Sequence, residues 1–451
     1  MTSLDITPLA PSEPGEDSPY RSYVYAYPHK TAYRPLPDRP RLREVWAGEP
    51  RDALSLYLHV PFCEMRCGFC NLFTRSTPPA EQVAAYLDAL ERQAEAVAEA
   101  IPGARYARGA LGGGTPTYLT ADELARLYDI AGRVLGADLA AIPTSVETSP
   151  ATATPDRLDV LAEHGVSRVS IGVQSFIDAE AHAAGRPQRR AEVDRALDAI
   201  RARTDAALNI DLIYGIDGQT PRTWRYSLDT ALEREPEELY LYPLYVRPLT
   251  GLGRRARDWD DHRLSLYRQG RDHLLDNGYR QVSMRMFERG DAPRAQGPDY
   301  CCQSDGMVGL GCGARSYTAD LHYSFDYAVG VGAVRAILAD YTARDRAGFE
   351  RAEVGFRLDE GERRRRHLLQ SLLRAEGVDP DLYRDRFASH PAADFPAEFA
   401  ELAARGWLVP GSDAEGERPL LTAEGLAHSD AIGPLFFSPR VTASMAGYDA
   451  R

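Results

Sequence analysis

The sequence predicts an α/β protein whose core is a partial (β/α)6 barrel, with an accessory region at each end of the chain. Six short apolar runs alternate with six helical patterns between residues 54 and 277, and this alternation is typical of a parallel sheet. The apolar runs are rich in β-branched and aromatic residues, as strands covered on both faces require. A doubly wound sheet is the alternative architecture for the same pattern.

The predicted elements follow one another at regular spacing. The strands are expected at residues 54–60, 104–111, 143–148, 168–173, 207–214 and 238–244. The helices are expected at residues 80–100, 121–136, 155–164, 189–203, 221–234 and 260–277. Several helices start at a capping residue. Thr120, for example, is followed three positions later by Glu123, which is the pattern of a capping box.

The regions outside the barrel, which is expected at residues 51–290, differ from it in composition. Residues 1–50 are predicted to form an N-terminal arm, partly disordered, because an acidic, proline-rich start leads into a stretch rich in Tyr, Pro and Arg. Residues 291–350 are expected to be a glycine-rich accessory segment with much loop. Residues 351–451 are predicted to form a helical, winged-helix-like domain, whose acidic surroundings favour a packing or lid role over DNA binding.

The bulk properties exclude several classes of protein. The 451-residue chain carries a formal net charge of −13, which disfavours a nucleic-acid partner. No apolar run approaches the ~20 residues of a membrane span, and the start lacks the basic and apolar regions of a signal peptide. Six cysteines in so long a chain do not suggest a disulfide scaffold. A cytoplasmic location is therefore expected, where clustered thiols act as metal ligands or redox groups.

The strongest chemical signal is the motif Cys63-x3-Cys67-x2-Cys70, directly after the first predicted strand. Incidental buried cysteines are one alternative. A structural zinc site is another, although it needs a fourth ligand. An iron–sulfur cluster is the third, because three thiolates on a cubane leave one iron open for a ligand. The candidates for a fourth zinc ligand are His59, Cys301, Cys302 and Cys312.

Further polar residues follow the other predicted strands. The glycine-rich string LGGGTPT (111–117) follows the second strand, and glycines allow a ligand to approach the backbone. Glu147 lies at the end of the third predicted strand, and Gln174 directly follows the fourth. Asp211 lies within the fifth, and Arg186 comes twelve residues after Gln174. The carboxyl ends of barrel strands form the mouth where active sites lie. An ion pair between Asp211 and Arg186 is the alternative to a binding role.

The cysteine motif, in this position after a barrel strand, resembles the signature of the radical S-adenosylmethionine (SAM) superfamily. The strings LYLHVPFC, GGGTPT, GVQSF and DLIYG resemble one branch of it, the oxygen-independent coproporphyrinogen III oxidases. The resemblance implies that Cys63, Cys67 and Cys70 hold a 4Fe–4S cluster whose open iron binds SAM. One electron would then cleave SAM to methionine and a 5′-deoxyadenosyl radical, which abstracts hydrogen.

The resemblance also implies which residues hold SAM. For the SAM on the cluster they are Tyr57, Phe69, Gly113, Gly114, Thr115, Glu147, Gln174, Arg186 and Asp211. The string CQSDGMVGLGCGARSY (302–317) resembles the segment that forms a second SAM pocket in this branch. Its expected contacts are Gln303, Gly311 and Ala314. Two SAM molecules are therefore expected.

The sequence departs from the oxidases directly after the cysteines. The oxidases have a motif that resembles C-x3-C-x2-C-x-C, whereas Asn71-Leu72-Phe73 follows Cys70 here. The related heme chaperones have a motif that resembles C-x-Y-C-D-F, which this chain also lacks. The strings CNLF, DGMVGLGCGARSYT and LYPLYVRPLTGLG, with the long arm, most resemble the class C radical SAM methyltransferases and cyclopropanases. The expectation is therefore methyl or methylene transfer to an sp2 carbon of a natural-product intermediate. Coproporphyrinogen decarboxylation and a non-enzymatic heme chaperone are the alternatives.

In that subgroup the radical from the first SAM takes hydrogen from the methyl group of the second, and the methylene radical adds to the substrate. The candidate proton-transfer residues are Tyr242, Tyr245, Glu288 and His59. Cys301, Cys302 or Cys312 could bring a thiol near the second SAM, with packing as the alternative. The expected partners are a small-molecule substrate and an electron donor such as flavodoxin or ferredoxin, with neither nucleic acid nor membrane.

Overall fold

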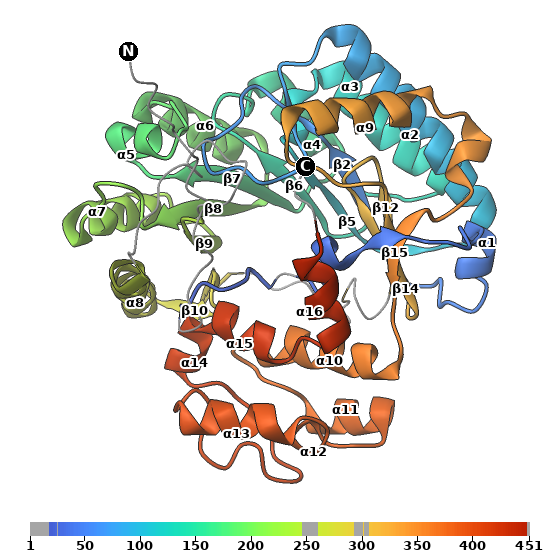
Figure 1. The fold of residues 1–451 in the computed structure, drawn as a ribbon. Coiled ribbons are helices and arrows are strands. Elements are labelled where there is room, and N and C mark those ends of the chain that lie inside the picture. The colour runs from blue at the N-terminus through green and yellow to red at the C-terminus, as the bar shows by residue number, and fades with distance from the viewer. Residues whose placement is uncertain (1–17, 25, 246–259, 293–300, 302–305, 449–451) are drawn as a thin grey trace, which may run out of the picture.

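The computed structural model describes residues 18–24, 26–245, 260–292, 301 and 306–448, and its central feature is one large sheet (Figure 1). Six of the thirteen strands are consecutive parallel neighbours. They are β2 (Leu54–Val60), β5 (Tyr106–Gly113), β6 (Thr144–Thr148), β7 (Arg168–Gln174), β8 (Ala207–Tyr214) and β9 (Glu238–Pro243). The predicted partial parallel barrel is confirmed.

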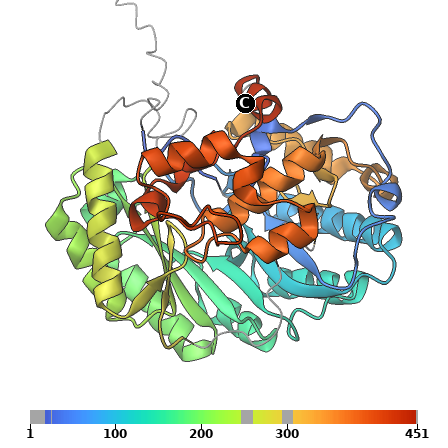
Figure 2. The same cartoon turned by 90° about the horizontal axis from the view of Figure 1, so that it is seen from below.

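The helices between these strands cover the outer face of the curved sheet (Figures 1 and 2). They are α2 (Ala80–Ala100), α3 (Ala121–Asp129), α4 (Pro155–Glu163), α5 (Asp178–Ala183), α6 (Arg190–Arg203), α7 (Pro221–Leu232) and α8 (Asp260–Asp276). Thr120 caps α3 by accepting a hydrogen bond from the Glu123 N–H, as the capping box predicted. A π-helical turn (Ile130–Val134) prolongs α3, whereas the short α5 was not predicted.

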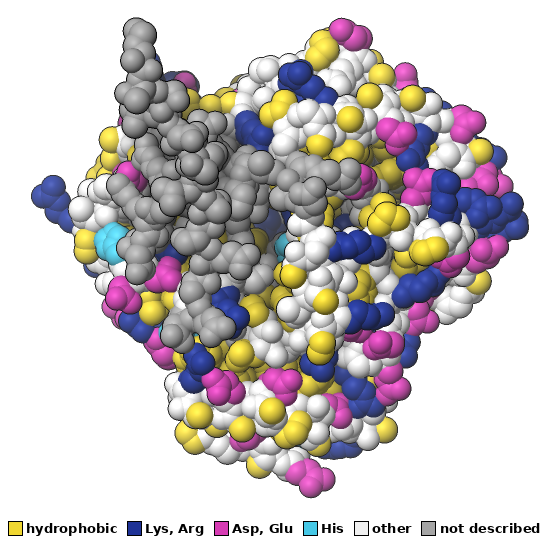
Figure 3. Space-filling view, in the orientation of Figure 1, with side chains coloured by type: hydrophobic (Ala, Val, Ile, Leu, Met, Phe, Trp, Pro, Cys, Tyr) yellow, Lys and Arg dark blue, Asp and Glu magenta, His cyan; other side chains and the backbone are white. Residues whose placement is uncertain are grey.

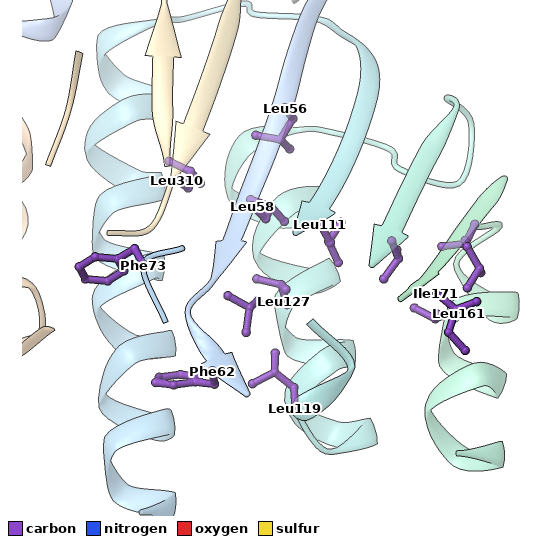
Figure 4. Close-up of a cluster of buried hydrophobic side chains, with 14 of the residues drawn as sticks. Leu56, Leu58, Phe62, Phe73, Leu111, Leu119, Leu127, Leu161, Ile171 and Leu310 are labelled. Carbon is purple, nitrogen blue, oxygen red and sulfur yellow. The ribbon is translucent and has the colours of Figure 1, made fainter. Parts of the chain in front are cut away.

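Side chains alternate between the two faces of the sheet along β2, and their residue types show which face is the outer one. Leu56 and Leu58 point to the outer face and belong, with Leu111 of β5 and Leu127 of α3, to one cluster of buried hydrophobic side chains (Figure 4). All four side chains are at most 1% exposed, and each such burial contributes about 1.5–3 kcal/mol relative to exposure. The residues between them, such as Tyr57 and His59, therefore point to the inner face, where the site lies.

The sheet continues on both sides of the barrel. Beside β2 come β12 (Met307–Leu310), β13 (Arg315–Tyr317), β14 (Leu321–Ser324), β15 (Val354–Arg357) and β1 (Arg34–Pro35). Beyond β9 come β11 (Met286–Arg289) and β10 (Tyr279–Gln281), the hairpin predicted at 278–289. The stretch 290–330 was expected to be loop-rich, and the three strands β12 to β14 within it were not predicted. The first of them, β12, pairs in parallel with β2 and extends the barrel by one strand.

The C-terminal region is helical and lies across the open side of the curved sheet (Figures 1 and 2). Its helices are α10 (Glu360–Leu372), α11 (Pro380–Phe387), α12 (Pro391–Asp394), α13 (Pro396–Ala404), α14 (Ala423–Ala427), α15 (Ser429–Leu435) and α16 (Pro439–Ala446). The expected winged-helix hairpin is reduced to one antiparallel bridge, Leu408 to Leu421. Tyr27 and Tyr33 of the arm join the hydrophobic cluster of this region. The predicted domain boundaries stay a prediction.

The other elements include the short α1 (Leu42–Val45), the longer α9 (Val331–Ala343) and the two-stranded sheet of β3 (Phe62–Cys63) and β4 (Arg75–Ser76). Across the face drawn in Figure 3, basic and acidic side chains are interspersed rather than gathered by sign. Among the described residues, no helix has both the length and the apolar character that crossing a membrane requires.

Candidate active site

The three motif cysteines lie on a loop that leaves the carboxyl end of β2. The loop is closed by β3 and β4, which pair Cys63 with Ser76, and the Thr77 N–H donates to the Cys63 carbonyl at 2.9 Å. A turn brings Cys70 back to Cys67, since the Cys70 N–H donates to the Cys67 carbonyl at 3.1 Å. Backbone hydrogen bonds therefore fix this loop at the mouth of the barrel.

Each thiol lies against a polar side chain. Thr115 Oγ1 is 3.6 Å from Cys63 Sγ, and Arg186 Nη1 is 3.9 Å from Cys67 Sγ. Burial raises the pKa of Cys63 to about 12 and also raises the pKa of Cys67. Bound metal is what would hold these thiols as thiolates, because a coordinating thiol loses its proton outright.

The donor set fits a cluster better than a single ion. Among the described residues, no three His, Cys, Asp or Glu side chains lie close enough together to hold one metal ion. A 4Fe–4S cluster binds each cysteine to a different iron, so its ligands need not meet at one point. The zinc alternative also loses two candidate ligands, because His59 is engaged by Tyr57 and Phe73 and Cys312 by Tyr86. Cys302 is outside the described residues.

The glycine string approaches the first cysteine closely. The Gly114 N–H donates to the Val60 carbonyl and the Thr115 N–H to the Phe62 carbonyl, each at 2.8 Å. A Cβ on Gly114 would lie 2.9 Å from Cys63 Sγ and 2.6 Å from the Phe62 carbonyl oxygen. Only glycine permits this approach, so the motif has a structural requirement as well as the expected binding role.

Glu147 lies where the glycine string can hold it. The Gly113 N–H donates to Glu147 Oε2 at 3.1 Å. The residue is exposed at the barrel mouth, although protein atoms surround its carboxyl group on several sides. Partial desolvation raises the pKa of Glu147 to about 7, the Gly113 N–H opposing the shift and Asp211 adding to it.

Asp211 points into the barrel from β8, but its partners differ from the one predicted. Asn209 Nδ2 donates to Asp211 Oδ1 at 2.8 Å, and Ser170 Oγ donates to Oδ2 at 3.5 Å. Burial raises the pKa of Asp211 to about 6. Arg186 instead donates to Gln188 Oε1 at 2.8 Å and reaches Cys67. The alternative of a direct Asp211–Arg186 ion pair is therefore wrong.

Gln174 ends β7 in a strained conformation. Its φ is +68°, and the pairing of β7 with β8 shifts register between Gly172 and Gln174. A Cβ on Gly172 would lie 2.7 Å from Gln174 Nε2 and 3.2 Å from Arg186 Nη1, so both side chains lie over Gly172. A positive φ at a non-glycine residue costs free energy and often marks a functional position.

A second segment docks onto the cysteine loop from α5. The Gly68 N–H donates to the Gly185 carbonyl at 3.1 Å, which fixes Arg186 beside the loop. Phe69 packs in a small hydrophobic cluster with Ile213, Leu244 and Tyr242. The cysteine loop is thus held against the ends of β8 and β9.

The proton-transfer candidates lie in different places. Tyr242 faces the interior at the end of β9, where burial raises its pKa well above the usual value. The Tyr245 hydroxyl donates to the buried Asp430 and accepts from Arg285 at 2.8 Å. Glu288 is opposite Glu238, the first residue of β9, and pairs with Arg280. Glu288 thus lies beside the amino end of β9, whereas Tyr242 lies near its carboxyl end, and a role for Glu288 in proton transfer stays a prediction.

The glycine-rich segment borders β2 on its other side. Tyr57 is in register with Gly309 of β12, and the Gly311 N–H donates to Gln93 Oε1 at 2.8 Å. Ala314 is buried in the turn, its N–H donating to the Gly311 carbonyl at 3.1 Å. Gln303 and the string RPLTGLG (247–253) lie outside the described residues.

Sequence reasoning missed a set of inward-facing polar residues below Asp211. Arg168 Nε donates to Glu238 at 2.7 Å and its Nη1 donates to Ser145 Oγ at 2.9 Å, while Asn209 donates to Ser170 Oγ at 2.7 Å. The alternation within the predicted strands already places these residues on the inner face. They form a polar floor to the barrel.

Known proteins resemble the chain in both sequence and fold. The radical SAM superfamily profile matches residues 57–231. The chain is 30% identical over 330 residues to the oxygen-independent coproporphyrinogen III oxidase of Escherichia coli, covering 67% of this chain and 71% of that one. It is 26% identical over 360 residues to the heme chaperone HemW of Bacillus subtilis, covering 78% and 92%.

Two further matches agree. The oxygen-independent coproporphyrinogen III oxidase of Paracoccus denitrificans is 36% identical over 273 residues, which span 58% of this chain and only 60% of the relative. The solved structure of coproporphyrinogen III oxidase (HemN) from Escherichia coli superposes with a TM-score of 0.78 at 26% identity, over 92% of this chain and 96% of that one. The chain belongs to the radical SAM superfamily. Within it, the chain falls in the coproporphyrinogen III oxidase-like branch.

The prediction of a class C methyltransferase or cyclopropanase is wrong. The oxidases and the heme chaperone match over most of the chain, so the natural-product methyl or methylene transfer is not supported. The string GMVGLGCGARSY, which favoured that prediction, is β12, a turn and β13. Its glycines are required by packing, since a Cβ on Gly309 would overlap the Arg315 backbone and one on Gly313 the His59 ring. Their presence therefore does not by itself favour methyl transfer.

Proposed function

We propose that the chain is a radical SAM enzyme of the oxygen-independent coproporphyrinogen III oxidase type. It would abstract a hydrogen atom from a porphyrinogen side chain, and the resulting radical would release carbon dioxide and pass one electron to an external one-electron acceptor. The observation that carries the proposal is the convergence of Cys63, Gly114 and Arg186 on one loop at the mouth of a barrel similar along its length to the oxidase. Relatives of this kind use a 4Fe–4S cluster and SAM.

The residues around the cysteine loop would hold SAM. Glu147 offers carboxylate oxygens to ribose hydroxyls, and Asp211 and Gln174 offer polar groups on the same inner face. Arg186, fixed by Gln188, places a positive charge beside Cys67, where it suits a carboxylate. Bound here, the cluster would supply the electron that cleaves SAM. Phe69 and Tyr242 would exclude water from the radical.

The substrate is proposed to bind on the inner face of the barrel. Lys30 lies near the cysteine loop, because it donates to the Tyr327 hydroxyl and that hydroxyl donates to the Asn71 carbonyl. A positive charge here suits the carboxylates that a coproporphyrinogen carries. A second SAM, bordered by Gly311 and Ala314, and an electron donor such as flavodoxin or ferredoxin complete the proposal.

The test is turnover by anaerobically reconstituted protein with SAM, dithionite and coproporphyrinogen III. We expect 5′-deoxyadenosine together with consumption of coproporphyrinogen and release of carbon dioxide. Cys67→Ala is the control and should abolish all three. Release of 5′-deoxyadenosine by the reconstituted protein with coproporphyrinogen left intact would contradict the proposed substrate.

A heme chaperone is the second candidate. Two observations support it. The match to HemW covers 92% of that relative. In addition, this chain has Asn71-Leu72-Phe73 at the place where the motif of the oxidases has a further cysteine. Stoichiometric heme binding without SAM cleavage in the same reconstituted protein would favour this candidate.

A further inference from the structure

His59 is enclosed by three glycines that all have positive φ. Its ring is buried at the carboxyl end of β2 and is only 5% exposed. A Cβ on Gly113 (φ +116°) would lie 2.6 Å from ring Cε1, and one on Gly313 (φ +105°) would lie 2.7 Å from the same atom. A Cβ on Gly311 (φ +97°) would lie 2.7 Å from the His59 carbonyl oxygen. The two glycine-rich segments therefore meet at this one side chain.

The hydrogen bonds of His59 define its protonation. Nε2 is 3.3 Å from the Phe73 carbonyl oxygen, which only accepts, so Nε2 carries the proton. Nδ1 is 3.2 Å from the Tyr57 hydroxyl, and in the neutral ring it accepts from that hydroxyl. Burial, with a smaller contribution from Arg315 and Lys30, lowers the pKa of His59 to about 4. The ring is therefore neutral, and both nitrogens are committed.

We propose that His59 is a positioning residue that locks the glycine string, the cysteine loop and the glycine-rich turn at 311–313 into one unit. It contacts the string at Gly113, the cysteine loop at Phe73 and the turn at Gly313. This replaces the expectation that His59 transfers a proton to the substrate. The role concerns the SAM site and so holds whichever substrate the enzyme uses.

Through the glycine string, His59 is connected to the groups that are proposed to hold SAM. Gly113 donates to Glu147, and the next residue, Gly114, lies against Cys63. A change of the His59 ring would let this string shift. Tyr57 would also lose the acceptor that orients its hydroxyl.

The first test compares His59→Phe with the conservative His59→Gln in the reconstituted full chain. Phe keeps a ring but loses both hydrogen bonds, whereas Gln can still donate to the Phe73 carbonyl. The readouts are iron per chain and the KM and kcat for SAM cleavage to 5′-deoxyadenosine without substrate. We expect iron retained in both, a KM for SAM about 10-fold or more higher in His59→Phe, and partial recovery in His59→Gln.

Two results would overturn the proposal. One is an unchanged KM for SAM in His59→Phe with SAM cleavage intact. The other is a pH–rate profile that loses a limb in His59→Gln, because a positioning residue leaves the shape of the profile unchanged and a proton donor does not.

A thermodynamic cycle tests the packing without any turnover. Gly313→Ala is made in the native chain and in a chain carrying His59→Ala, and the thermal midpoint of each is measured. The backbone strain of Ala at positive φ is common to both, so the difference isolates the clash with the ring. We expect Gly313→Ala to lower the midpoint more when His59 is present. An equal drop in both backgrounds would overturn the proposed contact.

Discussion

Two carboxyl groups at the barrel mouth have pKa values near neutrality, Glu147 at about 7 and Asp211 at about 6. In both, burial disfavours the charged form. Because their pKa values in the fold are raised, the native state binds protons that the unfolded chain has released, and their contribution to stability falls as pH rises from about 4 to about 7. Bound SAM would offset that loss by donating hydroxyl hydrogen bonds to the carboxylates.

Glu147 gives a prediction for SAM binding. The carboxylate form accepts hydrogen bonds and the protonated form does so less well, so the affinity for SAM should fall as pH is lowered from 8 to 6. Glu147→Gln should bind weakly at every pH and lose the part of this dependence that is centred near pH 7, leaving the part near pH 6 that Asp211 contributes. Equilibrium binding of SAM across this range measures the effect. A midpoint near pH 7 that survives in Glu147→Gln would contradict it.

At the residue scale, the direction of a side chain could be predicted where it had a fixed strand position. Glu147 and Asp211 are inward-facing because the alternation of β6 and β8 requires it. Glu288 lies beside the amino end of β9 rather than at the mouth, because its hairpin strand runs antiparallel to β9, and this position could not be predicted from the sequence. The contact of Arg186 with Cys67 could not be predicted, since the two residues are far apart in the chain and meet only in the fold, whereas its partner Gln188 is a near neighbour in the sequence.

The glycine string is the element whose geometry is most constrained. Gly114→Ala should prevent normal cluster assembly, because the new Cβ would lie 2.9 Å from Cys63 Sγ and 2.6 Å from the rigid Phe62 carbonyl. The measurement is iron per chain after reconstitution. Gly48→Ala is the matched control, since nothing lies within 4 Å of its Cβ. Equal iron in the two variants would contradict the close approach.

At the element scale, the barrel strands and their helices were predictable because the apolar residues of each recur with a clear period in its own sequence. The strands β12 to β14 were not, since each has only three or four residues, and a glycine-rich turn separates β12 from β13. Their signal lies in pairing: β12 is defined by its parallel register with β2, some 250 residues earlier in the chain. The turn at 311–313 was expected to bind SAM, but its contact with His59 was not foreseen.

At the scale of the whole molecule, a buried ion pair at the barrel mouth joins the C-terminal helices to the barrel. Asp430 of α15 pairs with Arg285, beside β11, and the side chains are 1% and 8% exposed. The Tyr245 hydroxyl donates to the same carboxylate, and the Arg285 guanidinium lies 4.1 Å from the Tyr23 ring centroid. The C-terminal helices, the arm and β9 therefore meet at Asp430.

Asp430→Asn should destabilise the fold strongly. It leaves Arg285 charged and buried, which costs about 3–5 kcal/mol in comparable pairs. Denaturant unfolding measures the change in the free energy of unfolding. The control is Glu424→Gln, whose pair with Arg268 is 40% and 44% exposed, and surface pairs contribute about 0–1 kcal/mol. Equal effects would show that Asp430 does not join the parts of the molecule.

The most direct test of the central claim follows the hydrogen atom. Reconstituted protein is given SAM, dithionite and coproporphyrinogen III deuterated in its propionate side chains, and the 5′-deoxyadenosine is analysed by mass spectrometry. If the barrel mouth holds SAM against a porphyrinogen, deuterium should appear in the 5′-deoxyadenosine, and Cys67→Ala should give none. Undeuterated 5′-deoxyadenosine from the active protein would contradict hydrogen abstraction from this substrate.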